Sequence, residues 1–182
     1  MPKGYSAVVR RGCVTLLGLL SACAARPDEP CVLLDSDFEQ FEGWVRPLPE
    51  WLSTEQARSG SYAYRVPDHE EYGGGYVKTL GSMCAFVPQR LRISGWVWLP
   101  NGRIRSTKLV VEVKCHGRRP DVWTGLEISQ VVKRFQLWEP IEKIIALPAD
   151  LQPSDELRVY VWHMEKEAEP TYLDDLKVEG WR

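Results

Sequence analysis

The 182-residue sequence lacks the motifs of the common enzyme classes. It contains no Gly-x-Ser-x-Gly nucleophile motif, no P-loop for phosphate and no Gly-x-Gly-x-x-Gly dinucleotide fingerprint. The three histidines, His69, His116 and His163, are isolated, without Ser, Cys or metal-ligand spacing around them. Among 25 acidic residues some carboxylates come close by chance, so a carboxylate pair is no evidence of a glycosidase. We therefore expect no catalytic residues and no enzyme.

The chain also lacks an excess of positive charge, since 23 Lys and Arg stand against 25 Asp and Glu, a net charge of −2. Proteins that bind nucleic acids in general need a basic stripe to neutralise phosphates. No such stripe is present, and neither are internal repeats or low-complexity tracts. Nucleic acid is therefore excluded as an expected partner.

The N-terminus has the three parts of a secretion signal: basic residues, a short apolar run over 14–19, and small residues before Cys23. The apolar run is too short to span a bilayer as a permanent helix. Leu20-Ser21-Ala22-Cys23 resembles the lipobox of bacterial lipoproteins, in which the preceding residues are removed and the Cys is acylated. The resemblance implies a signal peptide over 1–22, a lipidated (palmitate-bearing) Cys23 with a short tether over 23–30, and a membrane anchor. The alternative is an ordinary secretion signal with an incidental Cys.

The predicted address is the bacterial cell envelope. Ala24 follows the Cys, where some bacteria use Asp to retain lipoproteins at the inner membrane, so the outer membrane is favoured. Removing residues 1–22 leaves 160 residues, which fit a single domain over 31–182 and a monomer. The mature chain has 20 basic and 25 acidic residues, a net charge of −5.

Three cysteines, Cys31, Cys84 and Cys115, remain for the domain once Cys13 is removed and Cys23 is lipidated. Their spacing matches no zinc motif such as Cys-x-x-Cys. Outside the cytoplasm a pair can oxidise, and three thiols allow three single pairings. The sequence does not choose among them.

The domain shows repeated strand signals and no convincing helical stripe. Short alternating or β-branched runs are bounded by Gly, Pro, Asn and Asp. The expected fold is all-β, an antiparallel β-sandwich of two sheets or jelly roll. The expected strands are 32–41, 51–55, 61–66, 75–80, 91–99, 108–115, 125–131, 135–145, 157–163 and 172–179.

Three of these strands share an alternation between an aliphatic and an aromatic or charged side. In 91–99, 109–115 and 157–163 aliphatic residues occupy one side. If the strands are neighbours in one sheet, the other side presents an aromatic face that suits a glycan, because sugar C–H patches stack on flat rings and hydroxyls bind charged groups. Burial beneath a loop is the alternative, and Trp44, Trp51, Trp123, Trp138 and Trp181 are assigned to packing. The expected ligand-binding residues are Trp96, Trp98, Tyr160, Trp162, Glu112 and Lys114.

Four segments, taken in order, resemble the carbohydrate-binding-module jelly rolls of the galactose-binding-like superfamily. They are Asp35-Ser36-Asp37-Phe38-Glu39 with Gly43-Trp44, Arg58-Ser59-Gly60-Ser61-Tyr62-Ala63-Tyr64-Arg65-Val66, Leu91-Arg92-Ile93-Ser94-Gly95-Trp96-Val97, and Tyr172-Leu173-Asp174-Asp175-Leu176-Lys177-Val178. The resemblance implies two antiparallel sheets, a glycan-binding face and a structural calcium where the first and last strands meet. By that resemblance Glu39 and Asp174 would bind the metal, with Asp37 as a further candidate. The alternative is solvated charges at strand ends.

Two functions follow from these observations. The first is a lipid-anchored, non-catalytic envelope protein that binds a cell-wall or other polysaccharide on its aromatic face. The second is a structural or protein-interaction lipoprotein domain with no glycan ligand, in which the aromatic residues are buried.

Overall fold

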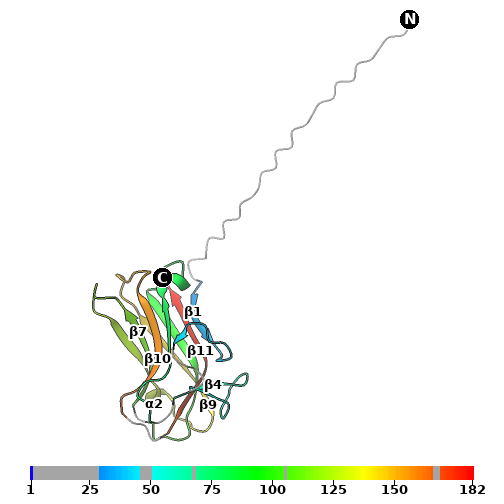
Figure 1. The fold of residues 1–182 in the computed structure, drawn as a ribbon, viewed down its shortest axis with the longest axis vertical. Coiled ribbons are helices and arrows are strands. Elements are labelled where there is room, and N and C mark those ends of the chain that lie inside the picture. The colour runs from blue at the N-terminus through cyan, green and yellow to red at the C-terminus, as the bar shows by residue number, and fades with distance from the viewer. Residues whose placement is uncertain (2–28, 46–50, 67–68, 105, 166–168) are drawn as a thin grey trace.

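The computed structural model describes Met1 and residues 29–45, 51–66, 69–104, 106–165 and 169–182. Two antiparallel sheets pack face to face (Figure 1). This confirms the predicted all-β sandwich. The six-stranded sheet contains β1 (Cys31–Ser36), β3 (Leu52–Ser53), β4 (Ala63–Val66), β6 (Arg90–Trp98), β9 (Trp138–Ala146) and β11 (Thr171–Trp181). The five-stranded sheet contains β2 (Trp44–Val45), β5 (Gly75–Thr79), β7 (Thr107–Lys114), β8 (Val122–Glu127) and β10 (Glu156–His163).

The central strands are long, and the pairing of β11 with β6 is interrupted by a register shift between Asp174 and Lys177. In the six-stranded sheet β11 pairs with β6, which pairs with β9, while β1 and β4 lie along the other edge of β11. In the five-stranded sheet β10 lies between β5 and β7, and β8 forms the far edge. The start of β1 and the end of β11 therefore meet at one end of the sandwich, where Cys31 lies opposite Gly180 (Figure 1).

The aliphatic sides of the strands form the core, as their alternation predicts. Side chains such as Leu91, Ile93 and Val97 of β6 are fully buried, as are Val111 of β7 and Val159 of β10. Each fully buried side chain of this size contributes about 1.5 to 3 kcal/mol. Because these residues come from both sheets, the core fixes which side of each sheet faces outward.

Several predicted boundaries differ from the structure. The strand expected over 125–131 begins earlier, at Val122, and residues Ile128–Val131 form the one-turn helix α2. The strand expected over 32–41 ends at Ser36, whose hydroxyl accepts a hydrogen bond from the N–H of Phe38, a residue with φ of 60°. A second one-turn helix, α1 (Leu80–Met83), follows β5. Local turns of this kind leave no periodic signal in the sequence.

Cys31 and Cys84 form a disulfide across 53 residues, which settles the pairing that the sequence left open. Cys115 is a buried free thiol, and burial raises its pKa. The disulfide ties the first residue of β1 to the residue that follows α1. Among the described residues, no helix has the length and apolar character needed to cross a membrane.

Candidate functional site

The predicted ligand-binding residues divide between two faces. Trp96 and Trp98 lie on β6, in the six-stranded sheet, whereas Tyr160 and Trp162 lie on β10, in the five-stranded sheet. All four side chains point away from the core, as their half-buried positions between buried neighbours show. The prediction that these residues form one face is therefore wrong. Alternation tells which side of a strand is apolar, but it does not tell which strands are neighbours.

An aromatic cluster does occupy the outer face of the five-stranded sheet. Trp123 of β8 and Trp162 of β10 meet edge to face, with 5.3 Å between ring centroids. The indole N–H of Trp123 donates to the Tyr160 hydroxyl at 3.1 Å. Tyr72 forms a β-bridge with Trp162, and its ring lies 6.2 Å from that of Tyr160. Four aromatic side chains from three segments thus form a continuous patch, which we call the aromatic cluster.

Two members of the cluster were not predicted. Trp123 is 45% exposed and was assigned to packing, and Tyr72 is 46% exposed and lies beside the glycine run Gly73 to Gly75. Trp123 lies on the outward side of β8, two residues before Gly125. Because the expected strand begins at residue 125, it does not include Trp123, and alternation along that strand could not identify it. Tyr72 belongs to a loop, so strand alternation could not find it.

A cleft of about 270 Å³ opens beside the cluster, between β5, β10 and β7. Tyr72 and Tyr160 line it together with the polar side chains of Glu112 and Arg158. Glu112 and Arg158 are direct cross-strand neighbours in the pairing of β7 with β10. The cleft therefore combines aromatic surface with a carboxylate and a guanidinium on one rigid floor, the combination that suits sugar rings and their hydroxyls.

The charged groups of this face are held by their neighbours. Lys114 pairs with Glu112 at 2.8 Å and with Asp121 at 2.9 Å. Hydrogen bonds to Glu112 and then Asp121 raise the pKa of Lys114, so it stays protonated well above neutral pH. Burial raises the pKa of Tyr160, so its hydroxyl stays neutral and able to donate. The structure thus places Tyr160, Trp162, Glu112 and Lys114 from the predicted set on the outer face of one sheet.

The predicted calcium ligands lie around one loop. Glu39 Oε1 accepts hydrogen bonds from the N–H groups of Ser61 and Tyr62, at 2.7 and 2.8 Å. Gly60 within this loop has φ of 56°, and a Cβ there would lie 2.5 Å from the same carboxylate oxygen. Asp37 only accepts a local bond from the N–H of Glu39, at 3.1 Å.

Asp174 holds the other end of the same loop from a fully buried position. Its Oδ2 accepts from the N–H groups of Arg58 and Ser59, at 2.7 and 3.1 Å, and its Oδ1 accepts from that of Asp175 at 2.8 Å. Burial raises the pKa of Asp174, and these backbone hydrogen bonds oppose that rise.

This arrangement does not fit a calcium ion. The carboxylates face N–H hydrogens, whereas calcium needs six to eight oxygen ligands. No group of three or more His, Cys, Asp or Glu side chains within the described ranges could hold a metal. The assignment of Glu39, Asp174 and Asp37 as calcium ligands stays a prediction.

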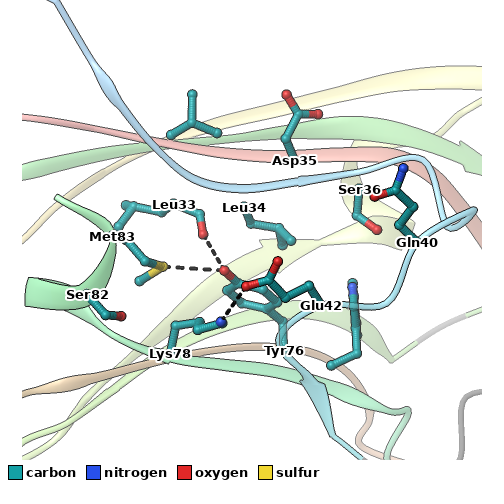
Figure 2. Close-up of a pocket in the computed structure, with 12 residues that line it drawn as sticks. Leu33, Leu34, Asp35, Ser36, Gln40, Glu42, Tyr76, Lys78, Ser82 and Met83 are labelled. Atoms are coloured by element: carbon teal, nitrogen blue, oxygen red, sulfur yellow. Dashed lines mark hydrogen bonds and ion pairs between the residues drawn. The ribbon is translucent and has the colours of Figure 1, made fainter.

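A separate pocket of about 360 Å³ lies at the open edge of the sandwich, between β1 and β5 (Figure 2). Here the Tyr76 hydroxyl donates to the carbonyl of Leu33 at 2.7 Å and lies 3.4 Å from the sulfur of Met83. Lys78 pairs with Glu42 at 3.0 Å across the mouth (Figure 2). These groups close the edge of the sandwich by binding one another, so we assign the pocket a structural role.

Comparisons with known proteins agree on the fold. No protein-family model matches the sequence, and no curated protein matches it. Among solved structures, the chain is similar to the CBM22-1 xylan-binding domain of Paenibacillus barcinonensis Xyn10C, at 18% identity and a TM-score of 0.54, over 84% of this chain and 96% of that one. It is also similar to the C-terminal family 22 carbohydrate-binding module of Clostridium thermocellum Xyn10B, at 17% identity and a TM-score of 0.56, over 85% and 96%. The chain therefore has the jelly-roll fold of carbohydrate-binding modules.

Proposed function

We propose that this protein is a non-catalytic carbohydrate-binding protein, anchored by lipid in a bacterial cell envelope. The observation that carries the proposal is the aromatic cluster beside a cleft that also contains Glu112 and Arg158. Sugar rings stack on exposed aromatic surface, and their hydroxyls bind charged side chains.

The proposed ligand is a polysaccharide without charge. Ion pairs on this face balance one another: Lys108 with Glu127, Lys114 with Glu112, and Arg158 with Glu156. A strongly acidic or basic polymer would therefore gain little from long-range attraction. The solved neighbours include domains named for binding xylan, which makes xylan the first polymer to test.

Calorimetric titration of xylan oligosaccharides and a panel of other neutral glycans tests the binding proposal. We expect Trp162→Ala to abolish binding at one class of site or to weaken the affinity of that site at least tenfold. This is a loss of about 1.4 kcal/mol or more of binding free energy. Tyr62→Ala is the matched control, because Tyr62 is 39% exposed but lies in the loop held by Glu39, away from the cluster. Binding that Trp162→Ala and Tyr160→Ala leave unchanged would overturn this assignment and favour the protein-interaction alternative.

The anchoring proposal depends on Cys23, which lies outside the described residues. Its support is the lipobox-like run Leu20-Ser21-Ala22-Cys23, together with the disulfide of the domain, which is typical of proteins outside the cytoplasm. By the same reasoning from Ala24, the outer membrane is the proposed location.

Phase partitioning of the protein expressed in a bacterium tests the anchor. Wild-type protein should enter the detergent phase and incorporate labelled palmitate, whereas Cys23→Ala should move to the aqueous phase or remain uncleaved. Cys13→Ala, within the same leader, should behave as wild type. If the wild-type protein stays aqueous and unlabelled, the protein is secreted without a lipid.

A further inference from the structure

A second groove, of about 490 Å³, lies on the outer face of the six-stranded sheet. It is built on β6, β9, β11 and β1, so the hydrophobic core separates it from the cleft described above. Trp96 forms one wall, and Ser94 and Gly95 lie in the floor. The proposed function does not use this groove.

The indole of Trp96 is held in place before any ligand binds. The guanidinium of Arg58 lies 3.8 Å from the centroid of its ring. Arg58 is itself fixed, because its side chain pairs with Asp175 and its backbone N–H donates to Asp174 at 2.7 Å. The guanidinium therefore covers one face of the indole, and the groove is lined by the part of Trp96 that Arg58 leaves uncovered, since Arg58 is not among its lining residues. A ring that is already ordered loses little freedom on binding.

The groove has an apolar row beside a polar row. Trp96 of β6 lies opposite Pro140 of β9, and both line the groove. Two residues along β6, about 7 Å away, Ser94 lies opposite Glu142 on one side and Lys177 on the other.

Lys177 in turn lies opposite Asp35 of β1, so four strands contribute to the polar row. Sugars present the same two kinds of surface, a patch of C–H groups and a rim of hydroxyls. The two rows lie about 7 Å apart along β6, so one ligand can contact both.

The charges of the groove restrict the ligand. Its lining contains the carboxylates of Asp35, Glu142 and Asp175 and the ammonium group of Lys177. Lys177 is already paired with Asp35 and Glu179, and Asp175 with Arg58, so a uronic acid would find no free ammonium group in this lining and would meet the carboxylate of Glu142. The groove therefore suits an uncharged sugar.

We propose that this groove is a second saccharide site, specific for uncharged pyranosides, on the face opposite the aromatic cluster. One molecule then holds two glycan segments at once and can bridge two polysaccharide chains. The inference shares with the proposed function only the class of ligand, since the two sites use different sheets and different residues. Bridging raises the apparent affinity for a polymer above that for a short oligosaccharide.

Stoichiometry distinguishes one site from two. We expect xylohexaose, or cellohexaose if xylan does not bind, to titrate with two ligands per wild-type chain. Trp96→Ala and Trp162→Ala should each reduce this to one, and the double variant should bind none. Ser94→Arg, which fills the floor of the groove and leaves Trp96 in place, should match Trp96→Ala. Trp181→Phe is the control, because Trp181 ends β11, is half-buried and does not line the groove.

The outcomes separate the two proposals. A single ligand per chain that Trp162→Ala abolishes, and that Trp96→Ala and Ser94→Arg leave intact, overturns the second site and leaves the proposed function standing. A single ligand lost only in Trp96→Ala and Ser94→Arg supports the groove and overturns the cleft. Absence of binding by the wild-type chain overturns both. Tight binding of an oligogalacturonate to the Trp162→Ala variant would overturn the specificity for uncharged sugars.

Discussion

Replacing Cys31 and Cys84 together by serine is expected to lower the free energy of unfolding by about 4 kcal/mol. The disulfide closes a loop of 53 residues, and the stabilisation from closing a loop grows with its length. β1 has a further need for it, because among the described strands β1 pairs only with β11, and its register shifts between Val32 and Leu34. Loss of the disulfide therefore increases the conformational entropy of the unfolded chain. It also removes the covalent attachment of β1 in the folded state.

Urea unfolding of the wild type, of the double serine variant and of Cys115→Ala measures this effect. Cys115 is a buried cysteine outside the disulfide, so Cys115→Ala should cost about 1 kcal/mol, mainly from lost packing. Similar midpoints for the wild type and the double serine variant would show that β11 alone holds β1.

Asp174→Ala is expected to lower the free energy of unfolding by about 3 kcal/mol. The carboxylate is fully buried and accepts three backbone hydrogen bonds, including two from the loop residues Arg58 and Ser59. The donors lie in partly buried contacts, and each that loses its acceptor costs about 1 kcal/mol, rising to about 3 kcal/mol where water cannot reach it. The loop that carries Arg58 should loosen as well, and with it the cation–π contact to Trp96.

Asp175→Ala is the matched control for Asp174→Ala. Asp175 pairs with Arg58, but its side chain is 26% exposed, so its loss should cost less than about 1 kcal/mol. Both variants are compared with the wild type by urea unfolding. An equal cost for the two variants would contradict the role assigned to the buried carboxylate.

The same samples test for calcium. Because the carboxylates of Glu39 and Asp174 already accept backbone hydrogen bonds, millimolar calcium and a chelator should leave the melting temperature of the wild type unchanged. If calcium instead raises the melting temperature, and Asp174→Ala and Glu39→Gln remove that rise, the predicted metal site is present.

Much of the fold could be predicted because its signals are local. The alternation of 91–99 and 157–163 located β6 and β10 to within one residue at each end and identified their buried sides. The acidic residues at 39 and 174 were singled out as calcium ligands, and the structure places both against the loop around Ser59 and Gly60. Their contacts, however, are with backbone N–H groups.

The candidate site was predicted only in part, because it depends on contacts between distant segments. Tyr72 and Trp123 join Tyr160 and Trp162 across three segments, and one of these is a loop with no periodicity. A pattern within one strand contains no information about its neighbours in the sheet.

By itself the sequence determined the lipobox-like leader, the all-β class and the sidedness of 91–99, 109–115 and 157–163, because side chains alternate with a period of two along any extended chain. Only the tertiary structure decided that β6 and β10 belong to different sheets, and so placed Trp96 and Trp162 on opposite faces. Strand order is set by pairings between residues far apart in the chain, and these depend on how the whole core packs. The single aromatic face expected from the sequence thereby became two.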